Sequence, residues 1–216
     1  MNVENQPSRL ARSLTTTRRR YDRQALVYDL VESLPEWTFA HWRRLLWDRV
    51  TGGHILEVGV GTGKNIPYYP AGADVVAVDL SSRMLRRAVR RTREGASSVE
   101  LMQMAAESLA FPDHSFDYVA TTFVLCSVSD PIGALREMGR VCKPVGTLLL
   151  LEHVRIERPL IGLLMDLLNP VAVRMTGANI NRRTVANARR AGLILLSLES
   201  LAPMGLVTLI TAKPPR

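Results

Sequence analysis

The clearest structural signal in the chain is Ile55-Leu-Glu-Val-Gly-Val-Gly-Thr-Gly63. An apolar run there ends at an acidic residue and then breaks into three alternating glycines. Glycine tolerates backbone angles that other residues avoid, and it lets a ligand approach the bare main chain. The pattern therefore predicts a buried strand of an α/β sheet that leads into a tight turn, with a nucleoside-bearing ligand at that turn.

The charge beside the glycines narrows the class of ligand. A dinucleotide fingerprint spaces its glycines G-x-G-x-x-G and presents helix-start amides to a pyrophosphate. Here Gly59, Gly61 and Gly63 alternate, and Glu57 precedes them, where a carboxylate repels phosphate and attracts a cation such as an ammonium. About twenty residues later, Asp79 ends a second apolar run, in the position needed to accept both ribose hydroxyls. These two acids suit S-adenosylmethionine better than NAD.

Four segments resemble the class I S-adenosylmethionine-dependent methyltransferases and follow one another in that family's order: 57–63, 79–85, 106–117 and 116–152. Within the family, the layout is similar to the branch that holds ubiquinone-biosynthesis methyltransferases and bacterial phosphatidylethanolamine N-methyltransferases. The resemblance implies a Rossmann-like α/β fold. Its sheet is expected to have seven mostly parallel strands, with the last strand antiparallel and helices on both faces.

The hydrophobic pattern gives the expected elements and domain limits. One methyltransferase domain is predicted over 51–216, preceded by a disordered tail over 1–8 and an amphipathic helical arm or lid over 9–50. Asp130 and Pro131 are expected to begin one helix, and Ser81 or Ser82 to cap another. The predicted strands are 54–58, 75–79, 99–103, 118–122, 147–152, 193–199 and 206–212.

The resemblance also implies a set of site residues. Tyr21 would cap the methionine end of the cofactor, and Met84 would either pack its thioether against the cofactor or fill the core. His153 and Tyr28 are the predicted catalytic residues, and a histidine, a tyrosine or water remains open as the general base. No metal site is predicted. The expected cofactor-binding residues are Tyr21, Glu57, Gly59, Gly61, Asp79, Leu80, Met84, Ala106, Glu107 and Thr122.

The segment 156–182 is longer than a minimal connection. Its apolar part, 159–170, is interrupted by polar residues and is too short to span a bilayer, so we interpret it as a lid or a channel for an apolar acceptor. Arg182 and Arg183 follow in a pattern that looks like the phospholipid-methylating relatives. They are expected to hold a phosphate by forked hydrogen bonds, or to be solvated residues at a helix start.

Basic charge dominates the composition, with a formal net charge of +8. Arginines gather in the first 23 residues and again over 83–93, which favours a polyanionic partner or, alternatively, solvated helix faces. The arm is expected to lie on an anionic membrane or to pack on the core. No signal peptide is evident, so we expect a peripheral protein on the cytoplasmic face of the cytoplasmic membrane.

These observations favour stepwise N-methylation of phosphatidylethanolamine to phosphatidylcholine by in-line transfer. C- or O-methylation of a quinone precursor or another apolar small molecule is the first alternative. A non-catalytic nucleic-acid-binding protein is the second, although nucleic acid is not the partner we favour. Residues 121–128 lack the Pro-Pro-Tyr turn of the family members that methylate base amines, which argues against catalysis on bases but not against binding. The number of methyl groups, the head-group preference and the oligomeric state stay open.

Overall fold

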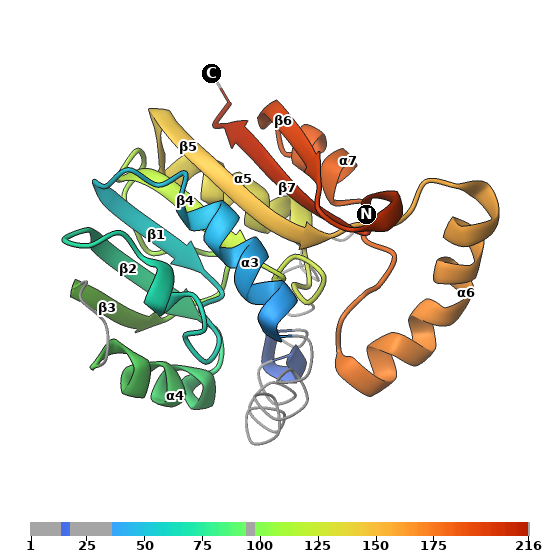
Figure 1. Cartoon of the computed structure of the whole chain (residues 1–216), viewed down its shortest axis with the longest axis horizontal. Helices are drawn as coiled ribbons and strands as arrows, with labels where there is room; N and C mark the ends of the chain where they lie inside the picture. The colour runs from blue at the N-terminus through green and yellow to red at the C-terminus, as the bar shows by residue number, and fades with distance from the viewer. Residues whose placement is uncertain (1–13, 18–35, 94–97, 216) are drawn as a thin grey trace, which may run out of the picture.

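A computed structural model describes residues 14–17, 36–93 and 98–215 of the chain. Seven strands form one sheet in the order β3-β2-β1-β4-β5-β7-β6 (Figure 1). The strands are β1 (His54–Val58), β2 (Asp74–Asp79), β3 (Ser98–Gln103), β4 (Phe116–Thr122), β5 (Cys142–His153), β6 (Ile194–Ser200) and β7 (Val207–Lys213). β1 to β5 pair in parallel, and β7 runs antiparallel to both of its neighbours. The predicted fold class is confirmed.

Helices cover both faces of the sheet because successive strand residues point to opposite sides. Ile55 packs in the same core cluster as Trp47 of α3 (Glu36–Trp47), whereas Leu56 packs in a second cluster with Met138 of α5 (Pro131–Val141). Figure 1 shows α3 in front of the sheet and α5 behind it. The remaining elements are η2 (Ile66–Tyr68), α4 (Ser82–Thr92), α6 (Pro159–Thr176), α7 (Thr184–Arg190) and η3 (Pro203–Gly205).

Helix starts follow the predicted capping chemistry. The side chain of Asp130 accepts hydrogen bonds from the amides of Ile132 and Gly133, and Ser81 accepts one from the amide of Met84. β5 begins at Cys142, earlier than the glycine at position 146 indicated, because Cys142 pairs with Phe116 before the main part of the β4–β5 ladder. The other strand ends lie within two residues of the predicted ones, and β6 and β7 are each shifted one residue later.

Helix α6 corrects the prediction for the apolar insertion. It has 18 residues, so it is longer than the apolar run 159–170 that looked too short to span a bilayer, and it continues through Asp166, Asn169 and Pro170, which interrupt that run. Asp166 pairs with Arg155, and Asn169 accepts a hydrogen bond from the amide of Ile180, so these polar side chains hold the helix to the body of the protein instead of ending it. Within the described ranges, α6 alone meets the length and composition of a membrane-crossing helix.

Most of the predicted N-terminal arm and the whole predicted tail lie outside the described residues, and with them Tyr21 and Tyr28. Residues 14–17 are helical, and α3 forms the last part of the segment assigned to the arm.

Candidate functional site

The carboxyl ends of four parallel strands meet at one edge of the sheet. Val58 of β1 pairs with Val78 of β2 and with Thr121 of β4, and Thr122 pairs with Leu151 of β5. Open parallel sheets bind ligands at this edge. A cavity of about 250 Å³ opens there.

The glycine turn after β1 forms one part of the cavity wall. Gly59 and Gly61 have φ angles of +79° and +55°, in the left-handed region that favours glycine. A Cβ atom on Gly59 would lie 2.2 Å from a methyl carbon of Val124, whereas Gly61 has open space around the same position. Gly59 thus allows the loop after β4 to close against the turn, and Gly61 leaves its main chain open to the cavity.

Asp79 sits at the end of β2 with its carboxylate fixed by main-chain groups. One oxygen accepts a hydrogen bond from the amide of Gly61 at 2.9 Å, and the other accepts from the amide of Ser81 at 2.8 Å. A carboxylate oxygen can accept more than one hydrogen bond. This arrangement fits a ribose with two adjacent hydroxyls.

The loop after β3 is tied to the loop after β4 by Glu107. Its carboxylate accepts hydrogen bonds from the amides of Ser129 and Asp130 at 2.9 and 3.3 Å. Nine of the predicted site residues line the cavity together: Gly59, Gly61, Asp79, Leu80, Met84, Ala106, Glu107, Thr122 and His153. The structure brings them to one place, and their individual contacts with a cofactor stay predictions.

Glu57 lies beneath the cavity and is not part of its lining. The residue is fully buried, and its carboxylate accepts hydrogen bonds from the hydroxyl of Tyr69 and the amide nitrogen of Asn65. Burial raises the pKa of Glu57 to about 7. Asn65 also donates to Thr122 of the lining and accepts from Arg43 of α3. The expected attraction between Glu57 and a cofactor ammonium stays a prediction, and it would act across this network.

Sequence reasoning missed the partners of Glu57. Asn65 and Tyr69 flank η2, where the sequence predicts a helix kept short by Pro67 and Pro70 and indicates no role for its flanking residues. The sequence does carry one usable signal, because a buried acid that ends an apolar strand needs hydrogen-bond donors close to it.

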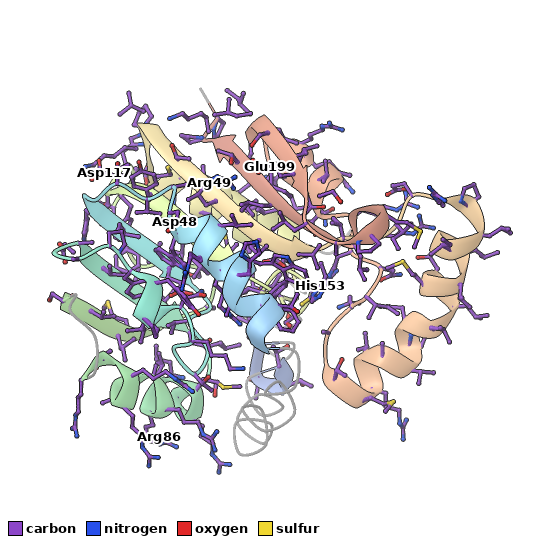
Figure 2. The ribbon with its side chains drawn as sticks, viewed as in Figure 1. Asp48, Arg49, Arg86, Asp117, His153 and Glu199 are labelled. Atoms are coloured by element: carbon purple, nitrogen blue, oxygen red, sulfur yellow. The ribbon has the colours of Figure 1, made fainter. Side chains whose placement is uncertain are left out.

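His153 is the last residue of β5 and lines the same cavity as Asp79. Its ring stacks on Phe123, with the ring centres 4.5 Å apart. Burial lowers the pKa of His153, so the imidazole is neutral near neutral pH and has one nitrogen able to accept a proton. Figure 2 shows His153 inside the molecule, in contrast to Arg86 of α4, which points outward.

The remaining wall of the cavity is mostly apolar. Residues of the segment 121–128 line it together with Thr176 at the end of α6 and with Leu14 and Thr17. The lining residues that the sequence did not single out include Leu14, Thr17, Val58, Val78, Met104, Thr176 and Ala178. Thr176 and Ala178 bring the apolar insertion to the rim of the cavity.

Arg182 and Arg183 are adjacent in sequence, but the structure separates their surroundings. The guanidinium of Arg182 donates to the main-chain oxygen of Val128 at 2.7 Å, and burial lowers its pKa. Arg183 is exposed and lines a second depression with Met204 and Thr208. The expected contact of these arginines with a phosphate stays a prediction. Across the described ranges, no group of three histidine, cysteine or acidic side chains is arranged to hold a metal.

The sequence of this chain is similar to those of known methyltransferases. Residues 56–150 match the family model described as a methyltransferase domain. A ubiquinone/menaquinone biosynthesis C-methyltransferase UbiE from Hahella chejuensis is 32% identical over 169 residues, which are 73% of this chain and 68% of that relative. A phosphatidylethanolamine N-methyltransferase from Cereibacter sphaeroides is 42% identical over 104 residues, 47% of this chain. The chain spans 51% of the length of the Cereibacter relative.

Solved structures share the fold at low sequence identity. A putative methyltransferase from Bacillus halodurans superposes with a TM-score of 0.65 at 18% identity, covering 82% of this chain and 98% of that one. A methyltransferase from Thermotoga maritima, described as dependent on S-adenosylmethionine, superposes with a TM-score of 0.62 at 22% identity, covering 88% of this chain and 99% of that one.

Proposed function

The chain belongs to the class I S-adenosylmethionine-dependent methyltransferases, and we propose that it methylates the amine of phosphatidylethanolamine at a membrane surface, stepwise toward phosphatidylcholine. The cofactor supplies a methyl group bonded to a positively charged sulfur. The residues around the cavity fit it: Asp79 offers a fixed carboxylate for a ribose, Gly61 offers open main chain, and Glu107 closes the neighbouring loops.

The observation that carries the proposal is a neutral histidine in the wall of a largely apolar cavity. An amine acceptor enters as an ammonium with a pKa near ~10, and it must lose a proton before its lone pair can attack. Burial in apolar surroundings lowers that pKa. His153 can then accept the proton, directly or through a water molecule. The cavity walls align the freed nitrogen with the methyl group, which is the main requirement of an in-line displacement.

Two further observations support a lipid acceptor. The Cereibacter relative is named for phosphatidylethanolamine methylation, and an apolar helix ends at the cavity rim. We place the protein on the cytoplasmic face of the membrane, with the arginine-rich N-terminal arm on anionic lipid. Arg182 or Arg183 singly would contact the lipid phosphate, and Tyr28 and Tyr21 would complete the site from the arm.

C- or O-methylation of a quinone precursor is the second candidate. The Hahella relative is named for ubiquinone and menaquinone biosynthesis, and this chain spans two thirds of its length. An apolar cavity with a neutral histidine also suits a phenolic ring that must be deprotonated. Arg182 and Arg183 would contribute little to the binding of such an acceptor, because it carries no phosphate.

Labelled S-adenosylmethionine distinguishes these candidates. The purified chain is incubated separately with phosphatidylethanolamine vesicles, with a quinone precursor in detergent and with duplex DNA. The proposal predicts label in the lipid amine. Label in the quinone precursor alone would overturn it, and tight duplex binding without any transfer would favour a nucleic-acid-binding protein. A chain that lacks residues 1–20 tests the role of the arm in membrane binding. Unchanged flotation of this chain with vesicles would mean that the arm does not bind the membrane.

A further inference from the structure

Helix α6 has one polar side, and that side is held to the body of the protein. Gly162, Asp166 and Asn169 follow at helical spacing and share this side. The guanidinium of Arg155 fills the space next to Gly162, where a Cβ atom would lie 2.4 Å from it. Asp166 accepts hydrogen bonds from that guanidinium at 2.8 Å and from the side chain of Asn181 at 2.9 Å.

The polar side is also held at Asn169, further toward the C-terminal end of α6. The side chain of Asn169 accepts from the amide of Ile180 at 3.0 Å and donates to Asn179 at 3.2 Å. Arg155 holds the pKa of Asp166 down at about 2, so this carboxylate remains ionised and paired at neutral pH. The helix therefore has a defined orientation relative to the sheet.

The other sides of α6 are apolar and uncovered. Leu160 is 83% exposed and Leu167 72% exposed, and only 6% of the helix is buried. Figure 1 shows α6 standing off from the sheet. The exposed apolar residues of this leucine side are Leu160, Leu163, Leu164, Leu167, Leu168, Val171 and Met175. A contiguous apolar surface of this kind marks a binding face, because a soluble protein rarely leaves one open to water.

Charge at the ends of the leucine side indicates the kind of partner. Arg158 precedes the helix and Arg174 lies in its last turn, and both are exposed. Arginines that flank an apolar strip complement an anionic lipid surface, where a layer of negatively charged head groups lies above the acyl chains. The net charge of +8 acts in the same direction.

We propose that α6 is a membrane-docking helix that lies in the plane of an anionic bilayer, with its leucine side in the boundary between head groups and acyl chains. It does not cross the bilayer, because Asp166 and Asn169 remain bonded to the body. Thr176 and Ala178 at its end line the cavity, so docking sets the cavity mouth at the lipid surface. The inference rests on the proposed function in one respect, that the acceptor resides in a membrane.

Vesicle flotation with the full chain tests the docking helix. Vesicles contain phosphatidylethanolamine and phosphatidylglycerol, and the variant is Leu163→Gln with Leu167→Gln. Removing two leucines from the acyl boundary is expected to weaken vesicle binding at least about tenfold. Calorimetry should find S-adenosylmethionine binding unchanged. Leu160→Gln with Leu164→Gln is a second pair on the same side and should give the same result.

The matched control is Leu196→Gln with Leu198→Gln, which makes the same change at two exposed leucines of β6. Flotation of this control should equal that of the unmodified chain. Equal flotation of the α6 variants, or an unmodified chain that stays with the unbound fraction, would overturn the proposal. A dimer in solution that the α6 changes dissociate would instead assign the face to a second copy. Flotation requires no methyl transfer, so docking without lipid labelling would sink the proposed acceptor and leave the docking helix standing.

Discussion

The cofactor side of the cavity and helix α6 present different kinds of surface: one has fixed polar groups, and the other has exposed apolar side chains. At the cofactor end, acids such as Asp79 and Glu107 are held by main-chain amides, and the turn is shaped by glycines. On helix α6, whose last residue reaches the cavity, a row of leucines outside the cavity lining is exposed. Fixed polar groups select one small molecule by geometry. An open apolar surface selects an environment, which explains why the cofactor is evident from local motifs and the acceptor is not.

His153 lies where the two regions meet, and its replacement should have the largest effect. His153→Gln removes the proton acceptor and should lower kcat about 10²- to 10⁴-fold while S-adenosylmethionine still binds. His41→Gln, at an exposed position of α3, is the matched control and should keep full activity. A kcat that survives the loss of His153 would assign proton removal to a tyrosine or to water.

Asp79→Asn tests the fixed polar end. The change removes the charge from a carboxylate that is aimed by two amides, and hydrogen bonds to a charged group contribute about 1.5–3 kcal/mol. The affinity for S-adenosylmethionine in calorimetry should fall about 10- to 100-fold. Asp74→Asn at the exposed start of the same strand should leave the affinity unchanged. Equal effects of both changes would mean that the loss reflects general charge.

Gly59→Ala tests whether the turn requires glycine because of its close contact with Val124 or only because of its positive φ angle. The added methyl group meets Val124 in the cavity wall, and overpacking of this kind costs about 1–3 kcal/mol. The affinity for S-adenosylmethionine is expected to drop by about tenfold. Gly72→Ala has a similar φ angle of +72° with open space around it, so it carries the backbone strain alone and should bind normally. Matching losses in both variants would assign the effect to strain.

Glu57 should give the smallest effect, and one that depends on pH. Its pKa of about 7 makes it neutral at pH 6 and ionised at pH 8, so attraction for a cofactor ammonium should strengthen binding about two- to fivefold across this range. Glu57→Gln should remove that dependence. A binding profile in the variant that parallels the unmodified chain would exclude Glu57 from cofactor recognition.

Stability gives the same residue a second readout. The pKa of Glu57 is raised in the folded state, so its stabilising contribution is complete below pH 4.5 and is lost as pH rises through about 7. Glu57→Gln should therefore lose less stability between pH 5 and pH 8 than the unmodified chain in thermal unfolding. Glu152, whose pKa burial raises to about 8, is present in both proteins and cancels in the comparison.

Local patterns predicted the sheet and the cofactor end. The strand ends at Val58 and Asp79 and the caps at Ser81 and Asp130 depend on neighbours in sequence, which is why the structure reproduces them. Contacts between segments that are distant in the sequence could not be predicted from local patterns. The pair of Arg155 with Asp166 carries α6 past residues that usually end a helix, and nothing local signals it.

The candidate site divides in the same way. Nine of the residues predicted from the motifs and the family resemblance line the cavity, whereas the predicted residue Glu57 does not, and lining residues such as Val58 and Met104 were not singled out. The hydrogen-bond network around Glu57 depends on Asn65 folding back from η2, and the separation of Arg182 from Arg183 depends on the main-chain oxygen of Val128. Both arise from packing that no short motif encodes. The acceptor side is apolar, and apolar walls carry little chemical identity.

One competition assay tests the central claim that the acceptor is a lipid amine presented at the membrane. The full chain receives labelled S-adenosylmethionine and a single population of anionic vesicles that contains phosphatidylethanolamine and a quinone precursor at equal mole fractions. We predict that label accumulates in mono-, di- and trimethylated lipid amine. Label that accumulates in the quinone ring while the lipid amine stays unlabelled would contradict it.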